Sequence, residues 1–193
     1  KKFGEDLAIL AGDALFLDPF GMIAASALPN EVKVALILEL SDASGSRGMV
    51  AGQVLDMEGE HKQLTLAELQ TIHANKTGRL LAYPFIAAGL ILELQADIAQ
   101  LLEKIGKKLG LAFQVRDDIL DLVADFEALG KTPQKDLVAE KSTYPALLGL
   151  EESKALLTSE LDACEDLLDQ ITATCDFDPR AIKKLIEGLR IDG

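Results

Sequence analysis

The chain has 193 residues, of which 49% are hydrophobic, and 32 acidic against 19 basic residues give it a formal net charge of −13. This length and apolar content are enough for one domain with a sizeable core, and the acidic balance argues against nucleic acid or an anionic membrane surface as a partner. The two cysteines, Cys164 and Cys175, are too few for a disulfide framework and favour a reducing cytoplasm.

Helical periodicity dominates the sequence, and no convincing run of alternating residues predicts a strand. We expect a single all-α domain over residues 1–193. A first helix is predicted from Lys2 to Leu28, where Asp18-Pro19 could disturb it. No signal peptide is visible in it.

A second helix is predicted from Glu31 to Met57, with Asn30 as its N-cap and Gly59 at its end. Its centre, Ser41 to Gly52, is rich in Ala, Ser and Gly. Small side chains of this kind let a neighbouring helix approach closely, so we expect a close helix contact there.

The third helix has a strong predicted start, because Thr65 and Glu68 fit a capping box. Pro84 is expected to kink or interrupt this helix. The apolar run from Leu80 to Leu92 is too short to cross a bilayer, so we expect no stable membrane insertion.

The remaining elements follow the same periodicity. We expect helices over 95–124, 144–150, 152–172 and 179–189, and a loop over 130–141.

The most informative segment lies near the end of the predicted helix 95–124. Each helical residue advances about 100°, so Gln114, Asp117, Asp118 and Asp121 share one stripe of an otherwise apolar helix. Clustered carboxylates repel one another, and a divalent cation would relieve that repulsion. Oxygen ligands select hard ions such as Mg²⁺, which completes its shell with water and substrate phosphates. The alternative is a solvated acidic face that arose by chance in an acidic protein.

A second candidate group is Lys76-Thr77, directly before Gly78. Adjacent residues do not share a helix face, so both can reach one ligand only if the helix is distorted there. Lys76 would then offer a phosphate-binding charge, and Thr77 a hydroxyl with a carbonyl freed by the kink. The alternative is a surface lysine beside a tolerated threonine.

Two further groups are weaker. Lys131 and Lys141 flank the predicted loop, which also carries Asp136, and they could neutralise a departing diphosphate; solvated loop lysines are the alternative. Gln53 and Asp56 are spaced three apart on the second helix, where a buried polar pair more often serves packing.

Taken in order, these motifs resemble the trans-prenyltransferase (polyprenyl synthetase) family. The resemblance is carried by Lys76-Thr77, by the run from Phe113 to Asp121, by Gly130-Lys131 and by the passage from Lys141 to Pro145, and it extends from Phe3 to about Glu151. Within that family, the sequence most resembles the bacterial farnesyl diphosphate synthases. The resemblance implies an isoprenoid-synthase helical bundle and a homodimer.

The resemblance also implies a mechanism. Mg²⁺, or Mn²⁺, would help the diphosphate leave an allylic substrate (dimethylallyl or geranyl diphosphate), and isopentenyl diphosphate would attack the resulting cation, giving most plausibly farnesyl diphosphate. By the same resemblance Asp117 is the direct metal ligand, with Asp118 and Asp121 ordering the metal's waters. Gln114, the Thr77 hydroxyl and the Lys76 carbonyl would face the cation, and Lys76, Lys131 and Lys141 would contact diphosphate. Gln53 and Asp56 match a family segment beneath the first metal cluster.

One departure from the family pattern stands out. The family's first Asp-rich motif and the basic residues that bind isopentenyl diphosphate would lie before Lys1, which is not an initiator Met. We therefore expect this chain to be the C-terminal two-thirds or so of a prenyl diphosphate synthase, with the N-terminal helices absent. The alternatives are a geranylgeranyl diphosphate synthase, a non-catalytic prenyl-synthase-like subunit, or a terpene cyclase, which would lack the Lys-Thr and Gly-Lys elements.

Overall fold

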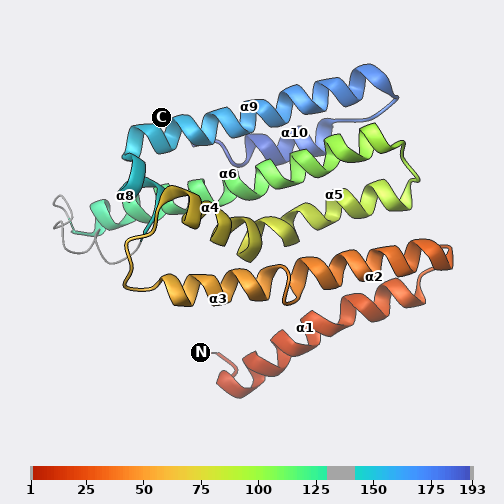
Figure 1. Cartoon of the computed structure of the whole chain (residues 1–193), viewed down its shortest axis with the longest axis horizontal. Coiled ribbons are helices and arrows are strands. Elements are labelled where there is room, and N and C mark those ends of the chain that lie inside the picture. The colour runs from red at the N-terminus through yellow and green to blue at the C-terminus, as the bar shows by residue number, and fades with distance from the viewer. Residues whose placement is uncertain (1, 130–141, 192–193) are drawn as a thin grey trace.

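The computed structural model describes residues 2–129 and 142–191, the side chains of residues 125–129 excepted. Helices and no strand occur in these residues, which confirms the all-α prediction. In chain order they are α1 (Glu5–Ala25), α2 (Asn30–Ser44), α3 (Met49–Gly59), α4 (Leu66–His73), the π-helical turn η1 (Ala74–Gly78), α5 (Arg79–Ile91), α6 (Ala96–Leu129), α8 (Tyr144–Leu148), α9 (Leu150–Thr174) and α10 (Arg180–Glu187). The long helices lie side by side, from α1 at one edge through α2 and α3, α5 and α6 to α9 and α10 at the other (Figure 1).

The first two predicted helices differ from the structure. α1 runs through Pro19 without a break. α2 starts at Asn30 with Pro29 as its N-cap and no side-chain cap, so the prediction of Asn30 as N-cap was wrong. The predicted helix 31–57 is two helices, because the chain turns between Gly45 and Gly48, where the Gly48 N–H donates to the Gly45 carbonyl at 3.0 Å. α3 ends at Gly59 as predicted.

The capping box at the start of α4 is confirmed. Thr65 Oγ1 accepts a hydrogen bond from the Glu68 N–H at 3.3 Å, and Glu68 Oε2 accepts one from the Thr65 N–H at 2.8 Å. The predicted distortion near Lys76-Thr77 is also present, as η1. The prediction that Pro84 would interrupt the helix was wrong, because α5 continues through it to Ile91. α5 packs closely against α6, because a Cβ atom on Gly106 would lie 2.8 Å from Cα of Ala82.

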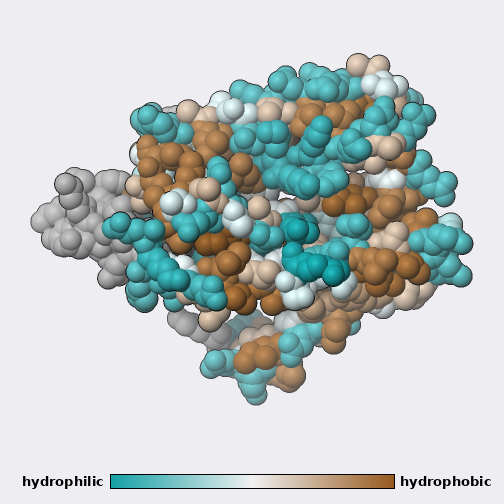
Figure 2. Space-filling model, in the orientation of Figure 1, coloured by the Kyte–Doolittle hydropathy of each residue, from teal (hydrophilic) through white to brown (hydrophobic). Residues whose placement is uncertain are grey.

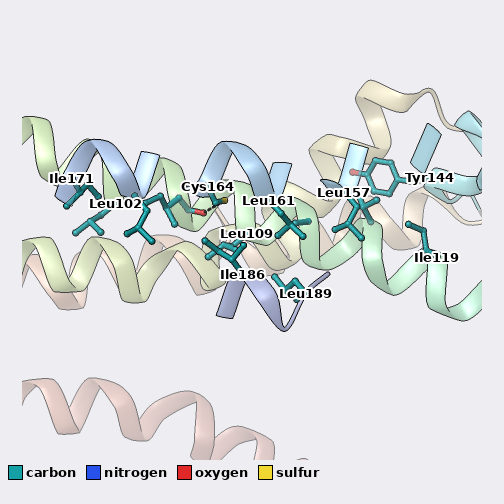
Figure 3. Close-up of a cluster of buried hydrophobic side chains, with 14 of the residues drawn as sticks. Leu102, Leu109, Ile119, Tyr144, Leu157, Leu161, Cys164, Ile171, Ile186 and Leu189 are labelled. Atoms are coloured by element: carbon teal, nitrogen blue, oxygen red, sulfur yellow. Dashed lines mark hydrogen bonds between the residues drawn. The ribbon is translucent and has the colours of Figure 1, made fainter. Parts of the chain in front are cut away.

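The core lies mainly between α6 and α9 (Figure 3). Both helices present apolar side chains at helical spacing toward each other, and α10 covers them with Ile186. The fully enclosed members of this cluster are Ile105, Ala112, Val115, Ile119, Tyr144, Leu161, Cys164, Leu168, Ile171 and Ile186. An ion pair between Lys108 and Glu160 at 2.9 Å ties the same two helices at the edge of the core. Cys164 is buried, Cys175 is exposed and both are free thiols.

Away from this core, several helices expose apolar side chains. None of the residues of α1 is buried. Figure 2 shows hydrophobic side chains reaching the surface along α1, α2 and α5. By length and composition α1 could cross a membrane, a test that core helices and signal sequences also pass.

Candidate functional site

The π-helical turn η1 lies in direct backbone contact with two helices. A Cβ atom on Gly52 of α3 would collide with the Lys76 backbone, and one on Gly110 of α6 would lie 2.7 Å from Cα of Gly78. Only glycine permits such an approach at these two positions. The close contact predicted for the Ser41–Gly52 section is therefore confirmed at Gly52, and η1 is held between α3 and α6.

This packing brings three predicted groups into one region. Gln114 follows Gly110 by one helical turn on α6, and Asp56 follows Gly52 by one turn on α3. Lys76 lies on η1 between them. π-Helical turns insert an extra residue into a helix and often occur at functional sites. Here the turn is the helix distortion that the sequence predicted at Lys76-Thr77.

Lys76 has a partner that the sequence did not indicate. Its Nζ lies 2.5 Å from Asp56 Oδ2, and each side chain is about one-third exposed (34% and 31%). The predicted pairing of Gln53 with Asp56 is not a buried pair, because Gln53 is exposed. Asp56 thus holds the ammonium group that was predicted to bind diphosphate.

The Asp stripe on α6 is accessible. Asp117 and Asp121 are exposed, and Gln114 and Thr77 are half-buried. None of these four side chains hydrogen-bonds to or forms an ion pair with any residue that the structure describes. Their oxygen atoms and the Gln114 amide are therefore available to a ligand.

Asp118 differs from its two neighbours in the stripe. It is half-buried, and its Oδ2 accepts a hydrogen bond from the Tyr144 N–H at 3.0 Å. The Tyr144 ring is buried and lies 5.5 Å from the His73 ring, centroid to centroid. Burial, reinforced by the negative charge of Asp118, raises the pKa of the Tyr144 hydroxyl. The sequence did not indicate this contact, because it joins residues far apart in the chain.

The donor set fits a hard cation in an open site. In the parts of the chain that the structure covers, no group of three or more His, Cys, Asp or Glu side chains is arranged to hold a metal ion. Mg²⁺ rarely needs such a cage, since it commonly binds through one or two carboxylates and keeps water and substrate phosphate as its other ligands. The exposed carboxylates of Asp117 and Asp121 suit that mode of binding.

The predicted loop lysines cannot be placed in the same way. Lys131 and Lys141, with Asp136 between them, lie outside the described residues. The segment directly after them is anchored: Ser142 Oγ accepts a hydrogen bond from the Leu64 N–H at 3.1 Å and donates one to the Lys62 carbonyl at 3.3 Å.

A cavity of about 350 Å³ lies among α2, η1, α5 and α6, and Glu39, Asp42, Asn75, Arg79 and Lys107 are in its lining. None of the predicted site residues lines it. The cavity thus borders η1, but the predicted site residues lie outside its lining.

Comparison with known proteins gives the family. The polyprenyl synthetase model matches residues 1–175. The farnesyl diphosphate synthases of Micrococcus luteus and Geobacillus stearothermophilus are 48% and 45% identical, over 97% and 86% of this chain. The matched region covers 64% and 57% of the length of these curated relatives.

Solved structures agree with the sequence comparison. The geranyltransferase of Helicobacter pylori, in its complex with magnesium and isoprenyl diphosphate, superposes with a TM-score of 0.77 at 31% identity, over 97% of this chain and 60% of that one. The helical bundle is therefore that of the prenyl synthases, as the resemblance implied. The chain belongs to the polyprenyl synthetase family.

Proposed function

We propose that this protein is a short-chain prenyl diphosphate synthase that condenses an allylic diphosphate, dimethylallyl or geranyl, with isopentenyl diphosphate. The observation that supports the proposal is the junction of η1, which carries Lys76 and Thr77, with α3 and with α6, the helix that also carries Gln114 and the Asp stripe, in a member of this family.

In the proposed reaction the allylic C1–O bond breaks and the diphosphate leaves with the bonding electrons. The double bond of isopentenyl diphosphate then supplies the electrons for the new C–C bond, and loss of a proton restores a double bond. Diphosphate and a longer allylic diphosphate are the products. Relatives named farnesyl diphosphate synthase support farnesyl diphosphate as that product, with geranylgeranyl diphosphate as the alternative.

The chain's own residues would stabilise the charges that develop. Lys76, oriented by Asp56, would bind the diphosphate, together with Lys131 and Lys141. The Thr77 hydroxyl and Gln114, with no other described partner, would turn their oxygen atoms toward the allylic cation. Gln53 would lie beside Asp56 as a supporting group.

Asp117 and Asp121 would hold Mg²⁺, with Asp117 as the direct ligand and Asp121 acting through water. When bound there, Mg²⁺ supplies positive charge that stabilises the leaving diphosphate. Mn²⁺ has the same preference for oxygen ligands. The magnesium and isoprenyl diphosphate in the H. pylori complex support Mg²⁺ as the ion and a prenyl diphosphate as the ligand.

We also propose that the protein is a single cytoplasmic domain that acts as a homodimer. In this proposal the apolar side chains of α1 pack against other protein helices, and α1 does not span a membrane. A non-catalytic prenyl-synthase-like subunit is the alternative function. Against it stand the retained Lys76, Thr77 and Gln114 and the Asp residues of α6, none of which such a subunit needs.

The test is to incubate the purified full-length protein, with the residues expected before Lys1, together with Mg²⁺, geranyl diphosphate and labelled isopentenyl diphosphate, and to separate the products by chain length after phosphatase treatment. We expect a labelled fifteen-carbon alcohol. Product of twenty carbons would favour the geranylgeranyl alternative, and no labelled product would favour the non-catalytic subunit.

A further inference from the structure

Asp118 connects two helices through a backbone group. Its Oδ2 accepts a hydrogen bond at 3.0 Å from the N–H of Tyr144, the first residue of α8. An N–H in the first turn of a helix has no acceptor within its own helix. Asp118 supplies that acceptor from α6, whereas the carboxylates of Asp117 and Asp121 have no described partner.

The residue that Asp118 holds is itself packed against other elements. Tyr144 is fully buried, and its ring contacts that of His73 at the end of α4. Two residues earlier, Ser142 hydrogen-bonds to the Leu64 N–H and the Lys62 carbonyl, in the segment between α3 and α4. The short segment from Ser142 to Tyr144 therefore joins α6 to α4 and to the residues that precede α4.

His73 leads directly into the candidate site. It is the last residue of α4, and η1 begins at the next residue, Ala74. Contacts thus run from Asp118 through Tyr144 and His73 to the turn that carries Lys76 and Thr77.

We propose that Asp118 is a positioning residue that fixes the Tyr144 backbone and, through the Tyr144–His73 contact, holds η1 opposite the Asp stripe. This role replaces the expectation that Asp118 orders a metal's waters beside Asp117 and Asp121. Its consequence for catalysis rests on the proposed function, but the structural role does not.

Two substitutions separate the roles. Asp118→Asn removes the charge and keeps a carbonyl oxygen that can accept the Tyr144 N–H, whereas Asp118→Ala removes both. The same pair at Asp121, which has no described partner, is the matched control. The measurement is amide hydrogen exchange in the metal-free protein, resolved at Tyr144 and over residues 74–78.

We expect Asp118→Ala to speed exchange at Tyr144 about ten-fold or more and to raise exchange over residues 74–78, because the buried N–H loses its acceptor. Asp118→Asn should stay close to wild type, as should both Asp121 variants. Failure of Asp118→Ala alone to fold would support the proposal. The proposal would be overturned if both Asp118 variants exchanged at the wild-type rate, or if exchange at Tyr144 and over residues 74–78 rose equally in both.

A second measurement asks whether the conservative variant, Asp118→Asn, keeps the catalytic activity that Asp118→Ala loses. With Mg²⁺ and both diphosphates, kcat should be at least ten-fold higher for Asp118→Asn than for Asp118→Ala. The Mg²⁺ concentration that gives half the maximal rate should be the same in both. If both variants instead need an equally higher Mg²⁺ concentration for half the maximal rate, Asp118 takes part in metal binding and the positioning role is wrong. If the wild-type protein shows no turnover, the proposed function fails, and the exchange measurement still decides the positioning role.

Discussion

The side chains of the candidate site differ in whether the protein already uses them. Lys76 is held by Asp56, and Asp118 by the Tyr144 N–H. Asp117 and Asp121 have no partner among the described residues, and the same holds for Thr77 and Gln114. Lys76 and Asp118 can therefore orient the candidate site. The four side chains without a described partner are available to the proposed metal ion and substrate.

The Asp stripe gives the first prediction. Asp117→Asn keeps the shape of the side chain but removes the charge that a direct metal ligand needs, whereas Asp121→Asn removes a charge expected to act through water. Loss of an outer group lowers activity by roughly 10- to 100-fold, and loss of a direct ligand should lower it further. Steady-state kcat at saturating Mg²⁺ should therefore fall more for Asp117→Asn than for Asp121→Asn.

Stability is the control for that comparison. Removing one of several clustered like charges relieves repulsion, so neither variant should lower the thermal midpoint of the metal-free protein. If both variants unfold at lower temperature and keep their activity per molecule, the stripe is structural and the magnesium assignment is wrong.

The two cysteines allow a second prediction at the residue scale. Burial between α6 and α9 raises the pKa of the Cys164 thiol to about 12. Because the unfolded chain loses this proton near pH 9, this contribution to stability is complete below that pH and is lost as the pH rises toward 12. The free energy of unfolding, measured by urea titration, should fall with pH in this range, and Cys164→Ala should reduce the slope by up to about 1.4 kcal/mol per pH unit.

Cys175 is the matched control, because its thiol is exposed. Cys175→Ala should leave the alkaline slope unchanged. If both variants reduced the slope of the unfolding free energy against pH by the same amount, burial of Cys164 would not govern this part of the pH dependence.

At the scale of elements, the central feature is a π-helical turn packed by glycines against the helices on both sides. Gly52 and Gly110 have no side chain to hold η1 away, so the backbone of Lys76-Thr77-Gly78 comes close to α3 and α6. The position of the turn is therefore set by backbone contact, which is less adaptable than contact between flexible side chains.

This packing predicts the effect of adding one methyl group. Gly52→Ala would place a Cβ atom against the Lys76 backbone, and overpacking of this kind lowers the free energy of unfolding by typically 1–3 kcal/mol. Gly12→Ala in α1 is the control, because a Cβ atom there meets nothing within 4 Å. Alanine favours a helix over glycine by up to about 1 kcal/mol, so Gly12→Ala should raise stability slightly.

Thermal unfolding of the two variants under the same conditions is the measurement. Gly52→Ala should also lower kcat, because Lys76 would move with its backbone. Equal stability of the two variants would mean that α3 and η1 are not in close contact.

Local signals predicted the elements well, and long-range packing explains the misses. The capping box at Thr65 and the end of α3 at Gly59 depend on a few adjacent residues, and both were predicted. α5 continues through Pro84 and fits closely against α6 at Ala82 and Gly106, a long-range contact that no local pattern reveals. The division of the second helix at Gly45–Gly48 was missed because the small residues around the turn were interpreted as a site of close helix packing, although two glycines among serines are also a local turn signal.

Within the candidate site, too, local signals were predicted and long-range contacts were missed. Side-chain chemistry and helical spacing were enough to propose Gln114, Asp117 and Asp121, and the need for a distorted helix at Lys76-Thr77 followed from their adjacency. The partners of Lys76 and Asp118 lie 20 and 26 residues away in the sequence. Such pairs follow from the arrangement of helices, so a single sequence does not contain a signal for them.

At the scale of the whole molecule, the core and the candidate site are built from different faces of the same helix. α6 places Val115 and Ile119 in the core that it shares with α9, while Asp117 and Asp121 of the same helix are exposed. One long helix therefore ties the stable core to the reactive region. This arrangement fixes the carboxylates on a helix of the core and leaves those of Asp117 and Asp121 exposed.

The central claim is that this site promotes departure of a diphosphate with the help of a divalent cation. The most direct measurement is the rate of condensation of geranyl diphosphate with isopentenyl diphosphate at increasing free Mg²⁺, with a parallel reaction in excess EDTA. We predict turnover that rises with Mg²⁺ to saturation, is restored by Mn²⁺ and is absent in EDTA. Undiminished turnover in excess EDTA would contradict the account.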